Sequence, residues 1–260
     1  MEFYNHLPLW LSSLLVLGGT VGICVAAHIG VRALIPKKTG ALSTELATAL
    51  IGAVSAFIGI MLAFAAVEVW QDYGSADQAV AQEAAASAEL YRDLTVYGDD
   101  TRVARVDLQH YVTSVLNDEW PKLAVGEPSP VTAADLNQLF RDVAAIHPGP
   151  GRDTVIYGQI FQKLNEVVGF RRARLITARA DLPLVFWLVV LTGSAVIVAF
   201  TFVYPATKTN LLFVAGLALS LGLIFLFILT VAHPFAGAYS VDDKEMRDLL
   251  PLFQRLSAPP

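Results

Sequence analysis

The sequence predicts an all-α membrane protein with four transmembrane helices in two pairs and a helical extramembrane domain inserted between the second and third spans. Hydrophobic residues make up 55% of the 260-residue chain and charged residues only 16%, with a mean hydropathy of +0.55. Soluble domains carry about 25% charged residues, so this balance is typical of a membrane protein. Four apolar runs reach the length of about 20 residues that a bilayer-spanning helix needs. The long segment between the second and third runs is polar and has helical periodicity.

The apolar runs begin close to the N-terminus. The first run contains no Asp, Glu, Lys or Arg, and only His28 lies near its end. Its flank "MEFYNH" has no Lys or Arg and a second run follows soon after, a pattern that is not typical of a signal peptide. Aromatic residues mark the membrane interfaces: Trp10, Trp70, Trp187 and Tyr204. The four predicted spans are Leu9–Val31, Leu46–Val67, Leu182–Val203 and Leu211–Val231.

The polar middle of the chain is predicted to be helical throughout. One helix there stops at Pro121, in the sequence "EWP". Thr132 and Asp135 make a capping-box-like start for a short helix, and "HPGPG" then forces a turn. The predicted helices cover residues 68–94, residues 102–119, a short stretch ending near Ile146, and residues 153–180.

The spans and the polar middle divide the chain into four parts. They are residues 1–67, the first transmembrane pair; 68–181, the helical extramembrane domain; 182–232, the second transmembrane pair; and 233–260, a C-terminal extramembrane tail with a short helix.

A single helix is predicted to run without a break from Leu46 to Leu94. Residues 65–94 contain no proline and one glycine, Gly74. At 1.5 Å per residue, the apolar part covers about 33 Å and the rest extends roughly 40 Å beyond the bilayer core. The second part is rich in alanine, the best helix former in water. Residues 68–94 are therefore expected to form a stalk that continues the second span.

Inside the membrane this helix has two distinct faces. A stripe of small residues follows steps of four, three, four and three: Gly52, Ala56, Gly59, Ala63 and Ala66. Small residues let helices approach closely in lipid. Two interpretations stay open: the stripe packs against a neighbour in the same chain, or copies of this helix meet around a symmetry axis.

The opposite face carries bulkier residues, which are the candidates for a pore or gate: Phe57, Met61, Phe64 and Glu68. In a symmetric assembly, Phe57, Met61 and Phe64 would stack as successive rings of apolar side chains. Such rings can close a pore by dewetting, and the carboxylates of Glu68 would lie at the mouth of the pore. The competing interpretation is that the two phenylalanines face lipid or the other spans.

Composition and motifs exclude several classes of function. A formal net charge of −5 leaves no basic surplus for nucleic acid. Cys24 is the only cysteine, so neither a disulfide framework nor a cysteine metal cluster can form within one chain. No HExxH, P-loop or CxxC motif occurs. We therefore expect no catalytic, cofactor-binding or metal site, and no enzyme. No Asp, Glu, Lys or Arg lies near the middle of a span, which argues against an ion-coupled transporter.

A group of arginines precedes the third span: Arg171, Arg172, Arg174 and Arg179. They form either an interfacial, salt-bridged face, with Glu83 or Glu89 as partner, or a basic vestibule that concentrates anions.

Several motifs together resemble the bacterial bestrophin-like membrane family, a domain of unknown function. They are "VWQDY…VAQEAA…LYRDL", "YVTSVLNDEWPKL", "RRARL" before "LPLVFW", and "HPFAGAYSV". The resemblance covers the chain from the first span to about residue 250 and implies two spans, a helical middle domain and two more spans. The family's name points to bestrophins, which are pentameric anion channels, although the bestrophin neck motif has no clear match here.

Two function hypotheses follow. One is an oligomeric, bestrophin-like ion channel, whose partners are the lipid bilayer, further copies of the chain and inorganic ions. The other is a non-conducting membrane sensor, scaffold or assembly protein that acts through its helical domain.

The predicted location is the bacterial inner (plasma) membrane. The connections within each pair carry Arg32, Lys37, Lys38 and Lys208, so the positive-inside rule places the middle domain and both termini outside the cytoplasm. The arginines before the third span oppose this orientation.

Overall fold

The structure, a computed structural model, describes residues 9–34, 41–237 and 239–257, and most of these residues are helical. No strand occurs among these residues, so the predicted all-α class is confirmed. In chain order the helices are α2 (Leu9–Leu34), α3 (Ala41–Tyr97), the 3₁₀ turn η1 (Asp99–Thr101), α4 (Arg102–Ser114), the π-helical turn η2 (Val115–Glu119), α5 (Trp120–Leu123), α6 (Pro130–Ala144), α7 (Arg152–Thr177), α8 (Leu184–Thr201), α9 (Lys208–Val231), α10 (Lys244–Arg247) and α11 (Leu249–Ser257). The flank "MEFYNH", Lys37 and Lys38, which entered the topology prediction, lie outside the described residues.

Four helices in the described part of the chain are long and apolar enough to cross a membrane, as predicted. They are Trp10–Leu34, Ser43–Tyr97, Leu184–Thr201 and Lys208–Val231. The third is shorter than the predicted span because the helix ends at Thr201 and the chain turns before Pro205.

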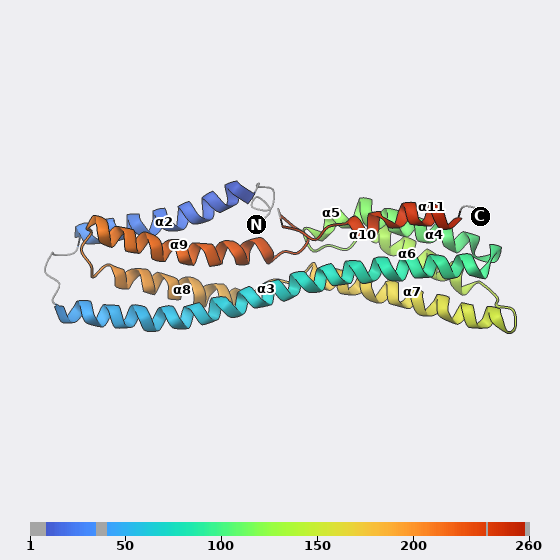
Figure 1. Ribbon diagram of the computed structural model, residues 1–260, viewed down its shortest axis with the longest axis horizontal. Helices are drawn as coiled ribbons and strands as arrows, with labels where there is room; N and C mark the ends of the chain where they lie inside the picture. The colour runs from blue at the N-terminus through green and yellow to red at the C-terminus, as the bar shows by residue number, and fades with distance from the viewer. Residues whose placement is uncertain (1–8, 35–40, 238, 258–260) are drawn as a thin grey trace. The chain divides into compact units, whose positions relative to one another are not determined.

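The first of two compact units contains α2, the first part of α3, α8 and α9 (residues 9–34, 41–71 and 181–232). Helices α2 and α9 lie side by side (Figure 1) and bury Cys24 together with Val214 and Ala218. Helix α3 packs into the same unit through its own apolar side chains: Trp70 stacks on Phe227 of α9 at a ring-centroid distance of 6.4 Å.

The second unit contains the rest of α3, helices α4 to α7, and the C-terminal helices α10 and α11 (residues 72–180, 233–237 and 239–257). Its core takes one or more fully buried leucines from each long helix, including Leu90, Leu108, Leu139 and Leu164. The C-terminal helix α11 joins this core because Phe253 stacks on Tyr91 with ring centroids 4.1 Å apart. The tail is thus an integral part of the second unit.

Helix α3 is a single helix of 57 residues that contributes to both units. Gly74 does not interrupt it. The helix ends at Gly98, whose φ of 127° is a conformation that favours glycine. The hydroxyl of Thr101 then donates to the carbonyl of Leu94 at 2.5 Å and satisfies one of the last helical acceptors.

Two predicted helix boundaries are wrong, and both errors involve proline. The helix over residues 102–119 does not stop at Pro121, because this proline lies in the first turn of α5, where a missing N–H costs little. Helix α6 starts before the predicted Thr132–Asp135 box. Ser129 is the N-cap: its hydroxyl accepts from the Thr132 N–H at 3.0 Å, and Pro130 occupies the first turn.

Candidate functional site

The membrane half of α3 uses one face for packing within its own chain. Ile58, Leu62, Ala65 and Val69 follow steps of four, three and four, and all are buried. Ile58 fits against Gly193 of α8, where its side chain occupies the space that a Cβ would need. This face anchors α3 to the other helices of its unit and fixes the direction in which the remaining faces point.

The predicted gate residues lie beside this buried face and are not covered. Phe57 is 59% exposed and Phe64 71% exposed, while Met61 is half-buried and Glu68 exposed. Residues spaced by three and four share one side of a helix, so the structure brings the four together along one edge of α3. The two phenylalanine rings therefore do not serve the core of a single chain.

The stripe of small residues is also uncovered. Gly52, Ala56, Gly59 and Ala63 are exposed and Ala66 is half-buried. None of the described residues comes within 4 Å of a Cβ placed on Gly52 or Gly59. The interpretation that the stripe packs against a neighbour in the same chain is therefore wrong for the described residues, because Ile58, Leu62 and Ala65 make that contact instead.

The arginines before the third span are divided between a buried network and the surface. Arg174 is fully buried in the second unit and binds two carboxylates. Its Nε donates to Glu83 of α3 at 2.7 Å, and its Nη2 donates to Glu119 at 2.8 Å. The predicted partner Glu83 is thus correct for Arg174, whereas Glu89 pairs with Lys163 at 2.6 Å.

Glu119 is held by a second arginine and by the backbone. Arg171 donates to its two oxygens from Nε at 3.1 Å and from Nη2 at 2.5 Å, and the Ser129 N–H donates at 3.2 Å. Glu119 lies on the π-helical turn η2, which places its carboxylate toward α7. Such wide turns are frequent at functional sites in proteins.

The network is electrically balanced, since two carboxylates meet two guanidinium groups. Burial by itself would lower the pKa of Arg174, but Glu83 and then Glu119 outweigh this and raise it. Burial, followed by the charge of Glu83, raises the pKa of Tyr111 well above its usual value, and its hydroxyl donates to Glu83 at 2.5 Å. The cluster links α3, α4 and α7 through hydrogen bonds from Tyr111 and Arg174 to Glu83.

The other two arginines are exposed. Arg179 donates to the carbonyl of Gly126 at 3.0 Å, and Arg172 lies on the exposed side of α7. A basic vestibule can draw only on these two side chains, because the charges of Arg171 and Arg174 are neutralised by Glu119 and Glu83. Among the described residues, no group of three or more His, Cys, Asp or Glu could hold a metal ion.

The sequence analysis missed Glu119 and Tyr111 as members of the network. The sequence signal for such a network is the pair of arginines that lie three residues apart on one side of a helix. When two arginines are buried together, they need more than one acidic partner. Glu119 is an acidic residue on an otherwise apolar helix face. Its position there could have indicated that it pairs with a buried basic residue.

Comparisons with known proteins agree with this architecture. A family model described as the Bestrophin-like domain matches residues 18–246. No curated protein matches the sequence significantly. The chain is similar to the crystal structure of a membrane protein, with a TM-score of 0.67 and 13% identity over 96% of this chain and 99% of the other. At this identity the similarity concerns the fold alone. The family match spans most of a chain with four apolar helices, and we conclude that this multi-pass membrane protein belongs to the Bestrophin-like domain family.

Proposed function

We propose that the protein is an oligomeric ion channel in which α3 of each copy faces a common axis. The observation that carries this proposal is the uncovered edge of α3: Phe57 and Phe64 are more than half exposed on a helix whose adjacent face is fully used for packing. Membership of the Bestrophin-like family supports a role in ion conduction. A symmetric assembly would cover these rings and align them into apolar constrictions.

The proposed assembly uses both exposed faces of α3. Copies approach through the small stripe, where Gly59 leaves open space for a neighbouring helix. The opposite edge, with Phe57, Met61 and Phe64, then faces the axis. Glu68 follows one turn later and supplies a ring of carboxylates. Because Arg171 and Arg174 are neutralised within the chain, this ring favours cations.

We further propose the arrangement of the chain in the bacterial inner membrane. The apolar helices form two pairs, and residues 68–181 are inserted between them outside the cytoplasm. Of the connecting basic residues, Arg32 and Lys208 are described and lie at helix ends toward the proposed cytoplasmic side. A cysteine in place of the exposed Pro128 should react with an impermeant maleimide in intact cells. Protection of this cysteine, with labelling at Leu34→Cys, would reverse the orientation.

Ion flux from liposomes tests the channel. Phe57→Ala and Phe64→Ala remove the proposed rings, so each should raise the flux through the assembled protein. Leu212→Ala is the matched control, since this α9 residue is 71% exposed, as Phe64 is, but lies on a different helix. Unchanged flux in both phenylalanine variants, with the assembly intact, would place the rings in lipid. Absence of flux in the wild type and in every variant would favour the non-conducting scaffold.

A further inference from the structure

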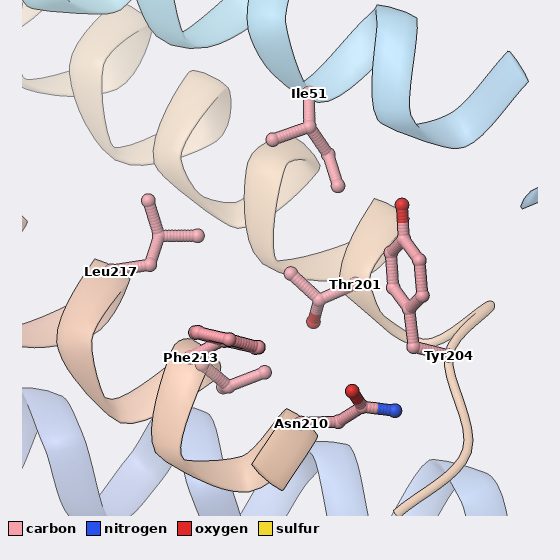
Figure 2. Close-up of a pocket in the computed structure, with 7 residues that line it drawn as sticks. Ile51, Thr201, Tyr204, Asn210, Phe213 and Leu217 are labelled. Atoms are coloured by element: carbon pink, nitrogen blue, oxygen red, sulfur yellow. The ribbon is translucent and has the colours of Figure 1, made fainter. Parts of the chain in front are cut away.

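A cavity of about 330 Å³ opens between α3, α8 and α9 in the first unit. Its apolar wall comes from Ile51, Phe213, Val214 and Leu217. The side chains of Thr201, Tyr204 and Asn210 gather at one end of it, with the apolar residues around the rest (Figure 2). No charged side chain lines it among the described residues. Its size lies in the range of small-molecule sites, roughly 300–1,000 Å³.

The polar end offers acceptors, because its hydroxyl protons are already used. Thr48 donates its hydroxyl proton to the carbonyl of Thr44 at 2.8 Å, so Tyr204 is the donor in the 2.5 Å bond between the two hydroxyl groups. The Tyr204 oxygen keeps its acceptor capacity. The amide nitrogen of Asn210 donates one of its two protons to the Pro205 carbonyl at 2.8 Å, and the amide oxygen is an acceptor.

Thr201 follows the same pattern and is almost fully buried. Its hydroxyl donates to the carbonyl of Val198 at 2.6 Å. The imidazole Nδ1 of His28 lies 3.3 Å from the same oxygen, and it can donate to that oxygen while the hydroxyl proton is directed at Val198. The cavity thus combines an apolar wall with three neutral acceptor oxygens, and the second N–H of Asn210 is the remaining donor of these three side chains.

We propose that this cavity binds an uncharged membrane amphiphile whose head group donates a hydrogen bond, such as a lipid bearing a free hydroxyl. The hydroxyl group would meet the oxygens of Thr201, Tyr204 and Asn210, and the hydrocarbon chain would lie along Ile51, Phe213 and Leu217. A charged head group is disfavoured, because the lining holds no opposite charge to offset its desolvation. This site is separate from the exposed edge of α3 assigned to conduction.

Binding of tritiated 1-decanol to the full-length protein in lipid nanodiscs tests the site, with empty nanodiscs as background. Decyl methyl ether has a similar chain but no hydroxyl proton. It should compete about fivefold more weakly than the alcohol, since one net hydrogen bond is worth a factor of this order. Decyl sulfate, which is anionic, should not compete.

Variants separate the cavity from general partitioning into lipid. Ile51→Trp should fill the cavity and abolish saturable binding, while Ile60→Trp, at an exposed α3 position outside the lining, should leave it unchanged. Asn210→Leu removes one of the three acceptor oxygens and should narrow the difference in affinity between the alcohol and the ether; it keeps the proposal testable if Ile51→Trp does not fold. Equal competition by alcohol and ether in the wild type, or saturable binding that persists in folded Ile51→Trp, would overturn the proposal.

Discussion

Asp107 of α4 and Asp142 of α6 interact where two helices meet, and this interaction shifts the pKa values of the two carboxyl groups in opposite directions. The buried Oδ2 of Asp107 has no hydrogen-bond partner among the described residues. Burial is the main cause that raises the pKa of Asp107 to about 6, followed by the hydrogen bond and the charge of Asp142, with Asp135 adding to the rise and His110 opposing it. The hydrogen bond from Asp107 lowers the pKa of Asp142.

The first prediction is that Asp107→Asn stabilises the protein at pH 7.5 but not at about pH 3.5, below the ordinary pKa of the carboxyl group. A raised carboxyl pKa contributes stability that is complete below about pH 4 and is lost as the pH rises through about 6. The amide of asparagine donates to Asp142 at every pH, so this loss should disappear. After solvent screening we expect an effect on the order of 1 kcal/mol, measured as the free energy of unfolding at both pH values. Asp100→Asn, at an exposed position, is the control. Equal pH dependence of the unfolding free energy in Asp107→Asn and the wild type would contradict the raised pKa of Asp107.

The second prediction concerns the buried arginine. Arg174→Met leaves Glu83 and Glu119 without their shared partner and should lower the free energy of unfolding by about 3–5 kcal/mol. Arg172→Met removes the same charge from an exposed position on the same helix. It should change the free energy of unfolding by less than about 0.5 kcal/mol. The free energy of unfolding is measured by urea unfolding in detergent. Similar losses of this free energy in the two variants would show that stability depends on net charge and not on the buried network.

The third prediction follows from the contact between Ile58 and Gly193. Gly193→Ala adds a methyl group where the Ile58 side chain lies and should cost about 1–3 kcal/mol by overpacking. Ile58→Ala in the same chain should recover part of that loss, since it vacates the space. Thermal unfolding of the two single variants and the double variant gives the interaction energy between positions 58 and 193. If the effects of the two substitutions simply add, the two helices do not meet at this point.

The fourth prediction is that Gly59→Leu weakens self-assembly while each individual chain remains folded. A Cβ at Gly59 would have no described residue of its own chain within 4 Å, so the substitution starts from open space. Gly19→Leu is the matched control, because Gly19 on α2 also has nothing within 4 Å. Native mass measurement after mild extraction should show a smaller assembly only for Gly59→Leu. A wild type that is monomeric under these conditions would refute the oligomer itself.

Local patterns in the sequence were sufficient for the helical class, the four apolar helices and the unbroken α3, because each depends on properties of adjacent residues. The ion network depended on pairing between residues far apart in the chain: Arg174 binds Glu83, 91 positions earlier, and Glu119, 55 positions earlier. Hydropathy also could not show which face of α3 is buried. Both the small stripe and the row that contains Ile58 are apolar, and only the position of Gly193 on α8 decides between them.

The π-helical turn over residues 115–119 has a consequence for how this sequence can diverge. Such a turn contains one residue more than an α-helical turn, and each residue of an α-helix advances the chain by about 100°. Deleting any one residue there would restore regular helix geometry but would rotate Glu119 away from Arg171 and Arg174. We therefore expect the extra residue and both arginines to change together, so that homologues without the insertion also lack the two basic side chains. Single-residue gaps should be common in the turn that follows α5 and rare in η2.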